Sequence, residues 1–369
     1  MSDPRSDLTP VVDLTAEPGT GPARIRRPRY VDLLPPCNAA CPAGENIQAW
    51  LEHAQAGRYE AAWRTLVRNN PLPAVHGRVC YHPCEGSCNR TVLDSAVSIH
   101  SVERFLGDLA NERGWEFSVE GPPTGRRILV VGAGPSGLSA AYHLARRGHS
   151  VEIREAGPAP GGMLHFGIPA YRLPRDVLLA ETARIQAMGV TLTLDHRVED
   201  LIDERDEGGF DAVYLALGAH VARRVDIPAR DAARLLEAVP VLRDVELGHP
   251  PELGRRVVVY GGGNTAMDMA RTARRLGAAE PIIVYRRDRG HMRAHDFEAD
   301  EAVAEGVRIR WLSSIAAVDG EDVVIERMRL DDDGYPQPTG EFETLQADSV
   351  ILAVGQRSDT EFLRNVPGV

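Results

Sequence analysis

All five cysteines lie between positions 37 and 88 of the 369-residue chain. They form two groups, Cys37-x3-Cys41-Pro and Cys80-x3-Cys84-x3-Cys88. An odd number of cysteines without an apolar leader argues against a disulfide framework and favours metal or redox chemistry. The spacing favours an iron–sulfur cluster, whose thiolates come from separate segments and often include one that precedes a proline. Tetrahedral zinc, which usually takes CxxC pairs, and buried inert thiols are the alternatives.

A glycine-rich turn follows the apolar run at 127–131 and opens a helical pattern. In GAGPSG, Gly132 allows a tight turn, Gly134 lets the backbone approach a pyrophosphate, and Gly137 lets the helix pack on the strand. The free N–H groups at the start of such a helix attract phosphate. Glu155, at the end of the next apolar run, can accept hydrogen bonds from both hydroxyls of a ribose. The segment therefore predicts a dinucleotide site.

A second glycine-rich turn also lies between an apolar run and a helical pattern. It reads Gly261-Gly262-Gly263-Asn264-Thr265-Ala266, and the charged residues after its second apolar run differ from those of the first unit. Where the first unit has Glu155, this one has Arg286 and Arg287. A carboxylate there would repel the 2′-phosphate of NADP, whereas guanidinium groups bind it through charge-assisted, bidentate hydrogen bonds. The arginines therefore predict NADPH rather than NADH, the alternative being two solvated surface side chains.

Alternating strands and helices have to position these turns. The two units, ILVVGAGPSGLSAAYHLARRGHSVEIRE and VVVYGGGNTAMDMARTARRLGAAEPIIVYRR, match element for element as an internal repeat. With further apolar runs at 212–218 and 349–355, they predict doubly wound parallel sheets. The cysteine-bearing segment instead has helical periodicity at 46–56, 59–67 and 98–111. Its core looks thin, and a bound cluster would help to close it.

Several motifs together resemble a known family. The chain is similar to the small (beta) subunit of glutamate synthase and to the N-terminal part of dihydropyrimidine dehydrogenase, from about Pro36 to Asp359. The motifs are CNAACP (37–42), GRVCYHPCEGSCNR (77–90), GAGPSG (132–137), GGMLHFGIPAYRLP (161–174), GGGNTAMD (261–268), YRR (285–287) and ILAVGQ (351–356). Together they are highly specific, although no single one would be. The resemblance implies a flavin oxidoreductase with two dinucleotide folds.

The resemblance implies FAD at the first unit and NADPH at the second. The residues that it assigns to FAD are Gly134, Pro135, Ser136 and Gly137 at the pyrophosphate, Glu155 at the ribose, Gly162 and Met163 at the flavin ring, and Arg172. For NADPH it implies Gly262, Gly263, Asn264 and Thr265 at the phosphates, with Arg286, Arg287 and Arg293 toward the 2′-phosphate.

The family carries two [4Fe–4S] clusters, and this sequence departs from its pattern. No C-x2-C pair precedes Cys37, and His76 stands where another cysteine is common. By the resemblance, one cluster takes Cys41, Cys80 and Cys84, with Glu103 as a fourth ligand, and the other keeps only Cys37 and Cys88. We therefore expect one well-bound cluster, with the second site lost or completed by His76 or a partner chain.

The expected fold class is α/β, with two Rossmann-like (two-dinucleotide-binding) domains preceded by a small α-helical iron–sulfur domain. We expect a disordered tail at 1–29, the helical iron–sulfur domain at 30–120, the first part of the FAD-binding domain at 121–235 and the NADPH-binding domain at 236–348. Residues 349–369 are expected to return as a strand to the FAD domain. Because the family continues beyond ILAVGQ, we expect a truncated or split chain that binds FAD weakly and associates through an exposed sheet edge.

The expected activity is that of an NADPH-dependent flavin oxidoreductase. Electrons would pass from NADPH through FAD to the cluster and on to a partner, by resemblance a large amidotransferase subunit in a hetero-oligomer that makes glutamate. A flavin belongs between a hydride donor and a one-electron carrier, and no acid–base side chain is required. The alternative is a cofactor-poor remnant that acts as a non-catalytic scaffold or binding module.

Other classes of function are disfavoured. The formal net charge of −11, from 42 basic and 53 acidic side chains, argues against a nucleic-acid partner. No apolar run approaches the eighteen or so residues that a spanning helix needs, and no secretion signal is evident, so a cytoplasmic location away from membranes is expected. The chain has no catalytic triad, HExxH motif or paired carboxylates at catalytic spacing. No CxxC lies near the flavin segment, which excludes a disulfide reductase.

Overall fold

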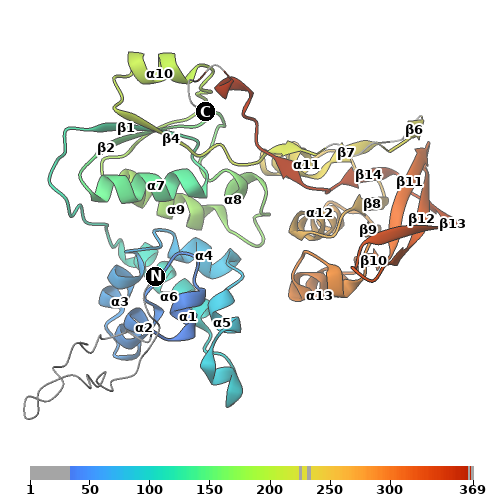
Figure 1. Ribbon diagram of the computed structural model, residues 1–369, viewed down its shortest axis with the longest axis horizontal. Helices are drawn as coiled ribbons and strands as arrows, with labels where there is room; N and C mark the ends of the chain where they lie inside the picture. Colours follow the sequence, from blue (N-terminus) through green and yellow to red (C-terminus); the bar gives the residue numbers. More distant parts are fainter. Residues whose placement is uncertain (1–33, 224–226, 231–233, 365, 367–369) are drawn as a thin grey trace, which may run out of the picture.

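The computed structural model describes residues 34–223, 227–230, 234–364 and 366. Figure 1 shows a helical part in blue below a first α/β part in green, and beside them a second α/β part that ends in an antiparallel sheet. The tail expected at 1–29 lies outside the described residues. Within the described ranges, no helix has both the length and the apolar character needed to cross a membrane.

The helical part surrounds a small apolar core. Trp50, Leu66 and Leu106 are fully buried in it, and Cys84 is buried beside them. The three helices predicted from periodicity are present as α2, α3 and α6. Three others are too short to show periodicity and have proline at or near their first turn, where its missing N–H costs nothing. The elements are α1 (Pro36–Ala40), α2 (Ile47–Gln55), α3 (Tyr59–Leu66), α4 (Pro73–Val79), α5 (Pro83–Gly86), η1 (Asn89–Val92) and α6 (Ile99–Arg113).

The first α/β part contains a four-stranded parallel sheet of order β3-β2-β1-β4. Because side chains alternate along a strand, Val130 and Ile153 pack with α7 and α9, whereas Leu129 and Val131 pack with α10. Figure 1 shows these helices on opposite faces of the sheet. The elements are β1 (Arg127–Val131), α7 (Pro135–Arg146), β2 (Ser150–Arg154), α8 (Met163–Phe166), α9 (Arg175–Gln186), β3 (Thr191–Thr193), α10 (Leu201–Glu207) and β4 (Ala212–Leu215).

The second α/β part contains a five-stranded parallel sheet of order β10-β9-β8-β14-β7. Val257 and Val259 pack on the helical side, whereas Val258 and Tyr260 face the antiparallel sheet. The elements are β7 (Leu235–Glu237), α11 (Ala238–Glu246), β8 (Arg256–Tyr260), α12 (Asn264–Arg275), β9 (Glu280–Val284), η2 (Arg289–His291), α13 (Asp296–Ala304), β10 (Arg308–Arg310) and β14 (Ser349–Leu352).

The antiparallel sheet has the order β13-β12-β11-β6, although β6 and β11 run parallel. It was not predicted, because charged residues interrupt its strands and almost all of β13 is exposed. Ile315, Val323 and Ile325 on its inner face complete the core over the parallel sheet. The strands are β6 (Ala229–Arg230), β11 (Ser313–Asp319), β12 (Asp322–Leu330) and β13 (Pro336–Gln346).

The prediction that the strand at 349 returns to the first dinucleotide part is wrong. The structure places β14 between β8 and β7 in the second parallel sheet. An apolar run that is buried on both faces suits either sheet, so its composition could not decide the placement. The chain returns only afterwards. β15 (Gln356–Arg357) pairs with β5 (Val221–Ala222), and Leu363 in η3 (Glu361–Leu363) packs with Leu129 and Val131.

Candidate functional site

The first glycine-rich turn connects β1 to α7 at the carboxyl end of its sheet. Gly132 has a φ of 105°, and a Cβ there would lie 2.5 Å from the carbonyl oxygen of Ala216. A larger residue would therefore be both strained and obstructed. Pro135 begins α7, and the Oγ of Ser136 lies 3.1 Å from the hydroxyl of Tyr214. The turn can thus present the backbone N–H groups of a helix N-terminus to an anionic ligand.

Glu155 lies directly beside this turn. Its Oε2 accepts a hydrogen bond from the N–H of Ala133 at 2.7 Å, and its Oε1 accepts one from the N–H of Gly157 at 2.8 Å. These two bonds orient the carboxylate at the end of β2, next to the backbone of the glycine-rich turn. This is the placement that a ribose-binding acidic residue requires.

The GGML segment lies against the same turn. Gly161 donates its N–H to the carbonyl of Ala133 at 2.8 Å. A Cβ on Gly162 would come within 2.9 Å of the Cα of Gly134, so the two backbones approach at this point as only glycine permits. Met163 follows as the first residue of α8. The structure therefore brings together the predicted FAD residues, apart from Arg172.

The second glycine-rich turn connects β8 to α12. The N–H of Gly261 donates to the carbonyl of Val284 on β9. The carbonyl of Gly262 accepts from the N–H groups of Arg293 and Ala294, both at 3.1 Å. These bonds hold the segment that follows η2 against the turn, so that Arg293 joins the site from outside the repeat.

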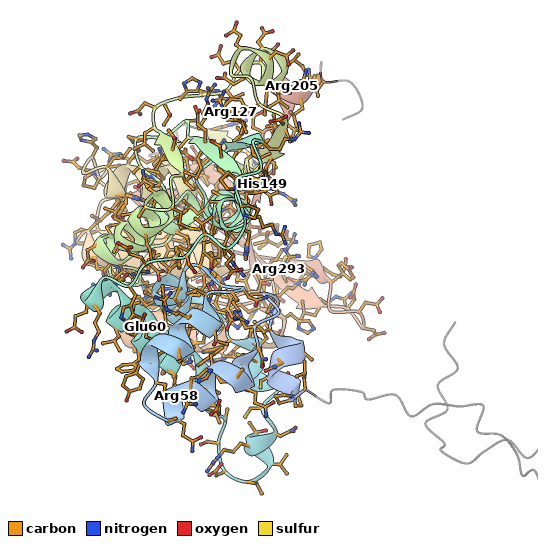
Figure 2. The ribbon with its side chains drawn as sticks, turned by 90° about the vertical axis from the view of Figure 1, so that its left-hand side faces the viewer. Arg58, Glu60, Arg127, His149, Arg205 and Arg293 are labelled. Atoms are coloured by element: carbon orange, nitrogen blue, oxygen red, sulfur yellow. The ribbon has the colours of Figure 1, made fainter. Side chains whose placement is uncertain are left out.

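Three arginines gather around this second turn. Arg286, Arg287 and Arg293 all lie near Tyr285. Burial raises the pKa of the Tyr285 phenol, and the positive charges of the three arginines reduce this rise. Nearby Arg289 is paired with Asp296 and Asp300. In contrast, no carboxylate among the described residues lies within ion-pair distance of the three arginines. In Figure 2, Arg293 is labelled below Arg127 of the first α/β part and above Arg58 of the helical part.

Arg172, predicted to reach a cofactor, is engaged between the two α/β parts. Its Nη1 donates to both carboxylate oxygens of Asp268 on α12 at 2.8 Å, and its Nη2 lies 2.8 Å from Glu298 on α13. Both carboxylates are buried. Burial raises the pKa of Asp268 to about 6, although the positive charge of Arg172 lowers this pKa in part. A contact of Arg172 with a cofactor stays a prediction.

Tyr81, the neighbour of Cys80, completes this contact from the helical part. Its hydroxyl donates to Glu298 at 3.4 Å and accepts a hydrogen bond from the amide of Asn264 in the second turn. Its ring stacks on His295, with ring centroids 3.8 Å apart. We call Tyr81, Arg172, Asp268 and Glu298 the polar junction. Sequence reasoning assigned no role to Tyr81, Asp268 or Glu298, because nothing in their spacing links them.

Cys41 and Cys80 lie near Cys84, and Cys88 lies near Cys37, while the division into two sets of cluster ligands stays a prediction. Burial, together with the nearby charges of Glu85, Cys41 and Cys80, raises the pKa of Cys84 to about 12. Burial also raises the pKa of Cys80, to which Glu103 and Cys41 contribute. Cys37 has Cys88 as its thiol neighbour. All five thiols are free.

A buried pair of carboxyl groups, Glu45 and Glu103, lies beside Cys41 and Cys80. Asn70 donates its amide N–H groups to Glu103 at 2.6 Å and to Glu45 at 3.0 Å, and Trp50 donates to Glu45 at 3.2 Å. Burial raises the pKa of both carboxyl groups. Two buried acids next to thiols suit a group that supplies positive charge, as the irons of a cluster would. Sequence reasoning missed Glu45 and Asn70.

His76 lies on α4, and its carbonyl accepts the N–H of Cys80 at 2.8 Å. Burial lowers the pKa of its imidazole to about 4, so this side chain is neutral at physiological pH. A neutral imidazole can act as a metal ligand. The described contacts do not place it with Cys37 or Cys88, and its role as a replacement ligand stays a prediction.

Two family matches cover most of the chain. Residues 126–368 match the pyridine nucleotide-disulphide oxidoreductase family, and residues 33–115 match dihydropyrimidine dehydrogenase domain II, 4Fe-4S cluster. The matches confirm the two dinucleotide-binding parts preceded by an iron–sulfur domain. They also confirm FAD, NADPH and a [4Fe–4S] cluster as the cofactors.

Curated relatives match most of the chain. The NADP(+)-dependent formate dehydrogenase subunit beta of Moorella thermoacetica is 40% identical, over 89% of this chain and 52% of the relative. The NADPH-Fe(3+) oxidoreductase subunit beta of Geobacter sulfurreducens is 37% identical, over 94% and 55%. The chain thus spans about half the length of these two relatives. The glutamate synthase [NADPH] small chain of Halomonas elongata is 32% identical, over 92% and 81%.

Solved structures share the fold. Mycobacterium tuberculosis FprA in complex with NADPH superimposes with a TM-score of 0.55 at 23% identity, over 64% of this chain and 71% of that one. The fold, the two dinucleotide turns and the cysteine-bearing domain agree with the sequence matches. The chain belongs to the pyridine nucleotide-disulphide oxidoreductase family, in the group that contains the glutamate synthase small chains and related beta subunits.

Proposed function

We propose that the chain is an NADPH-dependent flavin oxidoreductase that passes electrons from NADPH through FAD to an iron–sulfur cluster and on to a partner subunit. One observation carries the proposal. The two glycine-rich turns have opposite chemistry at the corresponding strand ends. Glu155 lies at the first, and at the second lie arginines that have no carboxylate partner among the residues that the structure describes. This difference supports two dinucleotides with separate roles in one chain.

The first turn would hold FAD, which when bound connects two-electron and one-electron chemistry. The N–H groups at the start of α7 would bind the pyrophosphate, and Glu155 would accept the ribose hydroxyls. Gly162 leaves room for close approach, and Met163 would border the ring. Arg172 would act here by holding the second α/β part in position, or by contacting the cofactor directly after a rearrangement.

The second turn would hold NADPH. Gly262, Gly263, Asn264 and Thr265 lie at the start of α12, where backbone N–H groups favour phosphate. Arg286, Arg287 and Arg293 would bind the 2′-phosphate, since each guanidinium can donate two parallel hydrogen bonds to it. Their side chains would therefore select NADPH over NADH.

One [4Fe–4S] cluster would be held by Cys41, Cys80, Cys84 and Glu103. The proposal is supported by the proximity of Cys41 and Cys80 to Cys84 and by the buried carboxyl of Glu103 near Cys80. Cys37 and Cys88 supply only two ligands to a second site, which would need His76 or a partner chain for completion. The domain thus favours one resident cluster.

The relatives' names support a protein partner that accepts or donates electrons. They describe beta subunits or small chains of a formate dehydrogenase, an Fe(3+) oxidoreductase and a glutamate synthase. We propose that this chain works in a hetero-oligomer whose other subunit decides the substrate. A large amidotransferase subunit and a formate-oxidising subunit are both compatible with the site, because neither substrate would meet this chain.

The absorption spectrum of the full-length chain, purified without oxygen, tests the proposal. After FAD is added, because binding is expected to be weak, we expect flavin bands on a broad iron–sulfur background, and loss of the flavin bands on adding NADPH. Cys41→Ser should keep the flavin bands and lose the cluster background, which separates the two cofactors. A colourless wild-type protein that stays colourless after cofactor reconstitution would instead support a non-catalytic scaffold.

A further inference from the structure

Two histidines and a glutamate in the helical part form a cluster that the proposed function does not use. His82, Glu85 and His100 each place one potential ligand atom within 4.8 Å of the other two. Among the described residues, no other group of three or more His, Cys, Asp or Glu side chains brings its ligand atoms within this distance of one another. The group contains no cysteine. Cys84, between His82 and Glu85 in sequence, is instead buried in the apolar core.

The spacing of the ligand atoms suits a single metal ion. The Nδ1 of His100 lies 2.7 Å from the Oε1 of Glu85, and the Nε2 of His82 lies 3.9 Å from its Oε2. Around a tetrahedral zinc ion with bonds of about 2.1 Å, ligand atoms are roughly 3.4 Å apart. The observed separations lie on both sides of this value, so small side-chain rotations would complete the site.

The surrounding groups would orient the three ligands. The Nε2 of His100 lies 3.4 Å from the Oγ of Ser101, which can fix the ring with Nδ1 free for metal. The backbone N–H of His100 donates to Glu85 at 2.9 Å and holds its carboxylate. Metal-binding histidines and carboxylates usually have such supporting hydrogen bonds. The site therefore has two of the outer contacts that a metal centre needs.

The backbone also holds His82 in place. This residue has a left-handed conformation, with φ 39° and ψ 58°, which non-glycine residues rarely adopt. Its N–H donates to the Sγ of Cys80, while its ring meets that of His100 edge-on at 4.2 Å between centroids. The side chains of His82, Glu85 and His100 are 26%, 16% and 34% exposed, which leaves access for an ion and a water ligand.

We propose that His82, Glu85 and His100 bind a divalent transition-metal ion of intermediate softness, such as Zn²⁺, with water at an open fourth position. Imidazole nitrogen and carboxylate oxygen are the ligands that favour such ions over Ca²⁺ or Mg²⁺. The ion would fasten the Cys80–Cys88 segment to α6, the helix that carries Glu103. This site is separate from the thiol ligands and does not depend on the proposed electron transfer.

Zinc binding to the cluster-loaded full-length chain tests this site. Cys37 and Cys88, which a single cluster leaves as free thiols, are first replaced by serine in this chain. Cys41, Cys80 and Cys84 are then filled by anaerobic reconstitution with iron and sulfide, loose metal is removed on a chelating resin, and Zn²⁺ is added by equilibrium dialysis. We expect one zinc per chain, and zinc-edge X-ray absorption should show nitrogen and oxygen neighbours at about 2.0 Å without sulfur at about 2.3 Å. A sulfur shell, or no zinc uptake, would overturn the proposal.

Variants locate the ion. His100→Gln and His82→Gln should each weaken zinc binding at least about tenfold, with iron and sulfide content unchanged. If His82→Gln disturbs the neighbouring cysteines, His100→Gln on α6 still decides the question. The matched control is His196→Gln, since His196 is paired with Glu204 at 2.9 Å without a second histidine. Equal zinc loss in the control, or full binding by His100→Gln, would contradict the assignment.

Discussion

At the scale of single residues, the chemistry depends on which charges are paired. Arg289 is already bound to two aspartates, whereas the adjacent Arg286 and Arg287 have no carboxylate partner in the described part of the chain. Paired guanidinium groups are largely neutralised, so only the other two remain available for an incoming phosphate. This contrast separates the two arginines that we propose to bind the 2′-phosphate from a structural arginine within four consecutive positions.

Arg286→Ala should weaken NADPH binding and leave NADH binding nearly unchanged. Losing one charge-assisted contact to the 2′-phosphate costs about 1.5–3 kcal/mol, or roughly tenfold or more in Kd. Fluorescence titration with both nucleotides measures the effect, and Arg289→Ala serves as the matched control. An equal loss for NADPH and NADH would show that Arg286 does not contact the 2′-phosphate.

Cysteines that we propose as cluster ligands should be needed for iron binding, and the other two cysteines should not. Cys41→Ser, Cys80→Ser and Cys84→Ser should each lose most of the bound iron and sulfide, because each removes one ligand of the same cluster. Cys37→Ser and Cys88→Ser should keep it. Anaerobic iron and sulfide analysis of the wild-type chain should give close to one cubane per chain. Two full complements would contradict the assignment of ligands.

At the scale of elements, a buried carboxylate joins the helical part to the first α/β part. Glu181 on α9 is fully buried and accepts the N–H groups of Ala74 and Val75, at 2.9 and 3.0 Å. It thereby caps the beginning of α4, the helix that ends at Val79 directly before Cys80. The stability of that segment depends on a side chain more than a hundred residues away in sequence.

Glu181 should make stability depend on pH. Burial raises the pKa of Glu181 from 4.5 to about 7, although the backbone N–H groups oppose the rise. Between these values the folded chain binds more protons than the unfolded chain, so the free energy of unfolding falls as the pH rises. The full effect is on the order of 3 kcal/mol.

Urea denaturation at pH 5, 6, 7 and 8 measures this dependence. Glu181→Gln should have a flatter profile than the wild type, since the amide does not titrate. Glu60→Gln, which changes an exposed partner of Arg64, should keep the wild-type slope. A parallel profile for Glu181→Gln would show that other groups cause the pH dependence.

At the scale of the whole molecule, the polar junction joins all three parts. Tyr81 belongs to the helical part, Arg172 to the first α/β part, and Asp268 and Glu298 to the second. A further ion pair between Arg175 and Glu246, at 2.6 Å, joins the two α/β parts. The orientation of the NADPH turn relative to the FAD turn therefore depends on a small number of charged contacts.

Arg172→Met should strongly destabilise the contact between the two α/β parts. It leaves Asp268 and Glu298 buried without their cation, and breaking a buried pair in this way costs about 3–5 kcal/mol. Tyr81→Phe removes one hydroxyl and should cost only about 1 kcal/mol. Thermal unfolding and limited proteolysis compare the variants. Equal stability of Arg172→Met and the wild type would show that the junction does not hold the parts together.

Local signals in the sequence determined much of this protein. The positions of Gly132 at a tight turn and of Glu155 beside it could be predicted, because both lie within one strand–helix–strand unit. Helices α2, α3 and α6 are long enough for their apolar periodicity to be visible. The cysteine groups were recognisable because their spacing and the resemblance both point to a cluster.

Tertiary packing decided what local signals cannot carry. Arg172 and Asp268 are 96 residues apart, and Tyr81 and Asn264 are 183 apart, so no spacing rule connects them. The apolar run of β14 suits either parallel sheet, and only packing beside β8 assigns it to the second. The cluster of His82, Glu85 and His100 likewise exists only because α5 packs near the start of α6. Contacts between distant segments depend on how whole elements pack, and a short stretch of sequence contains only its own half of each contact.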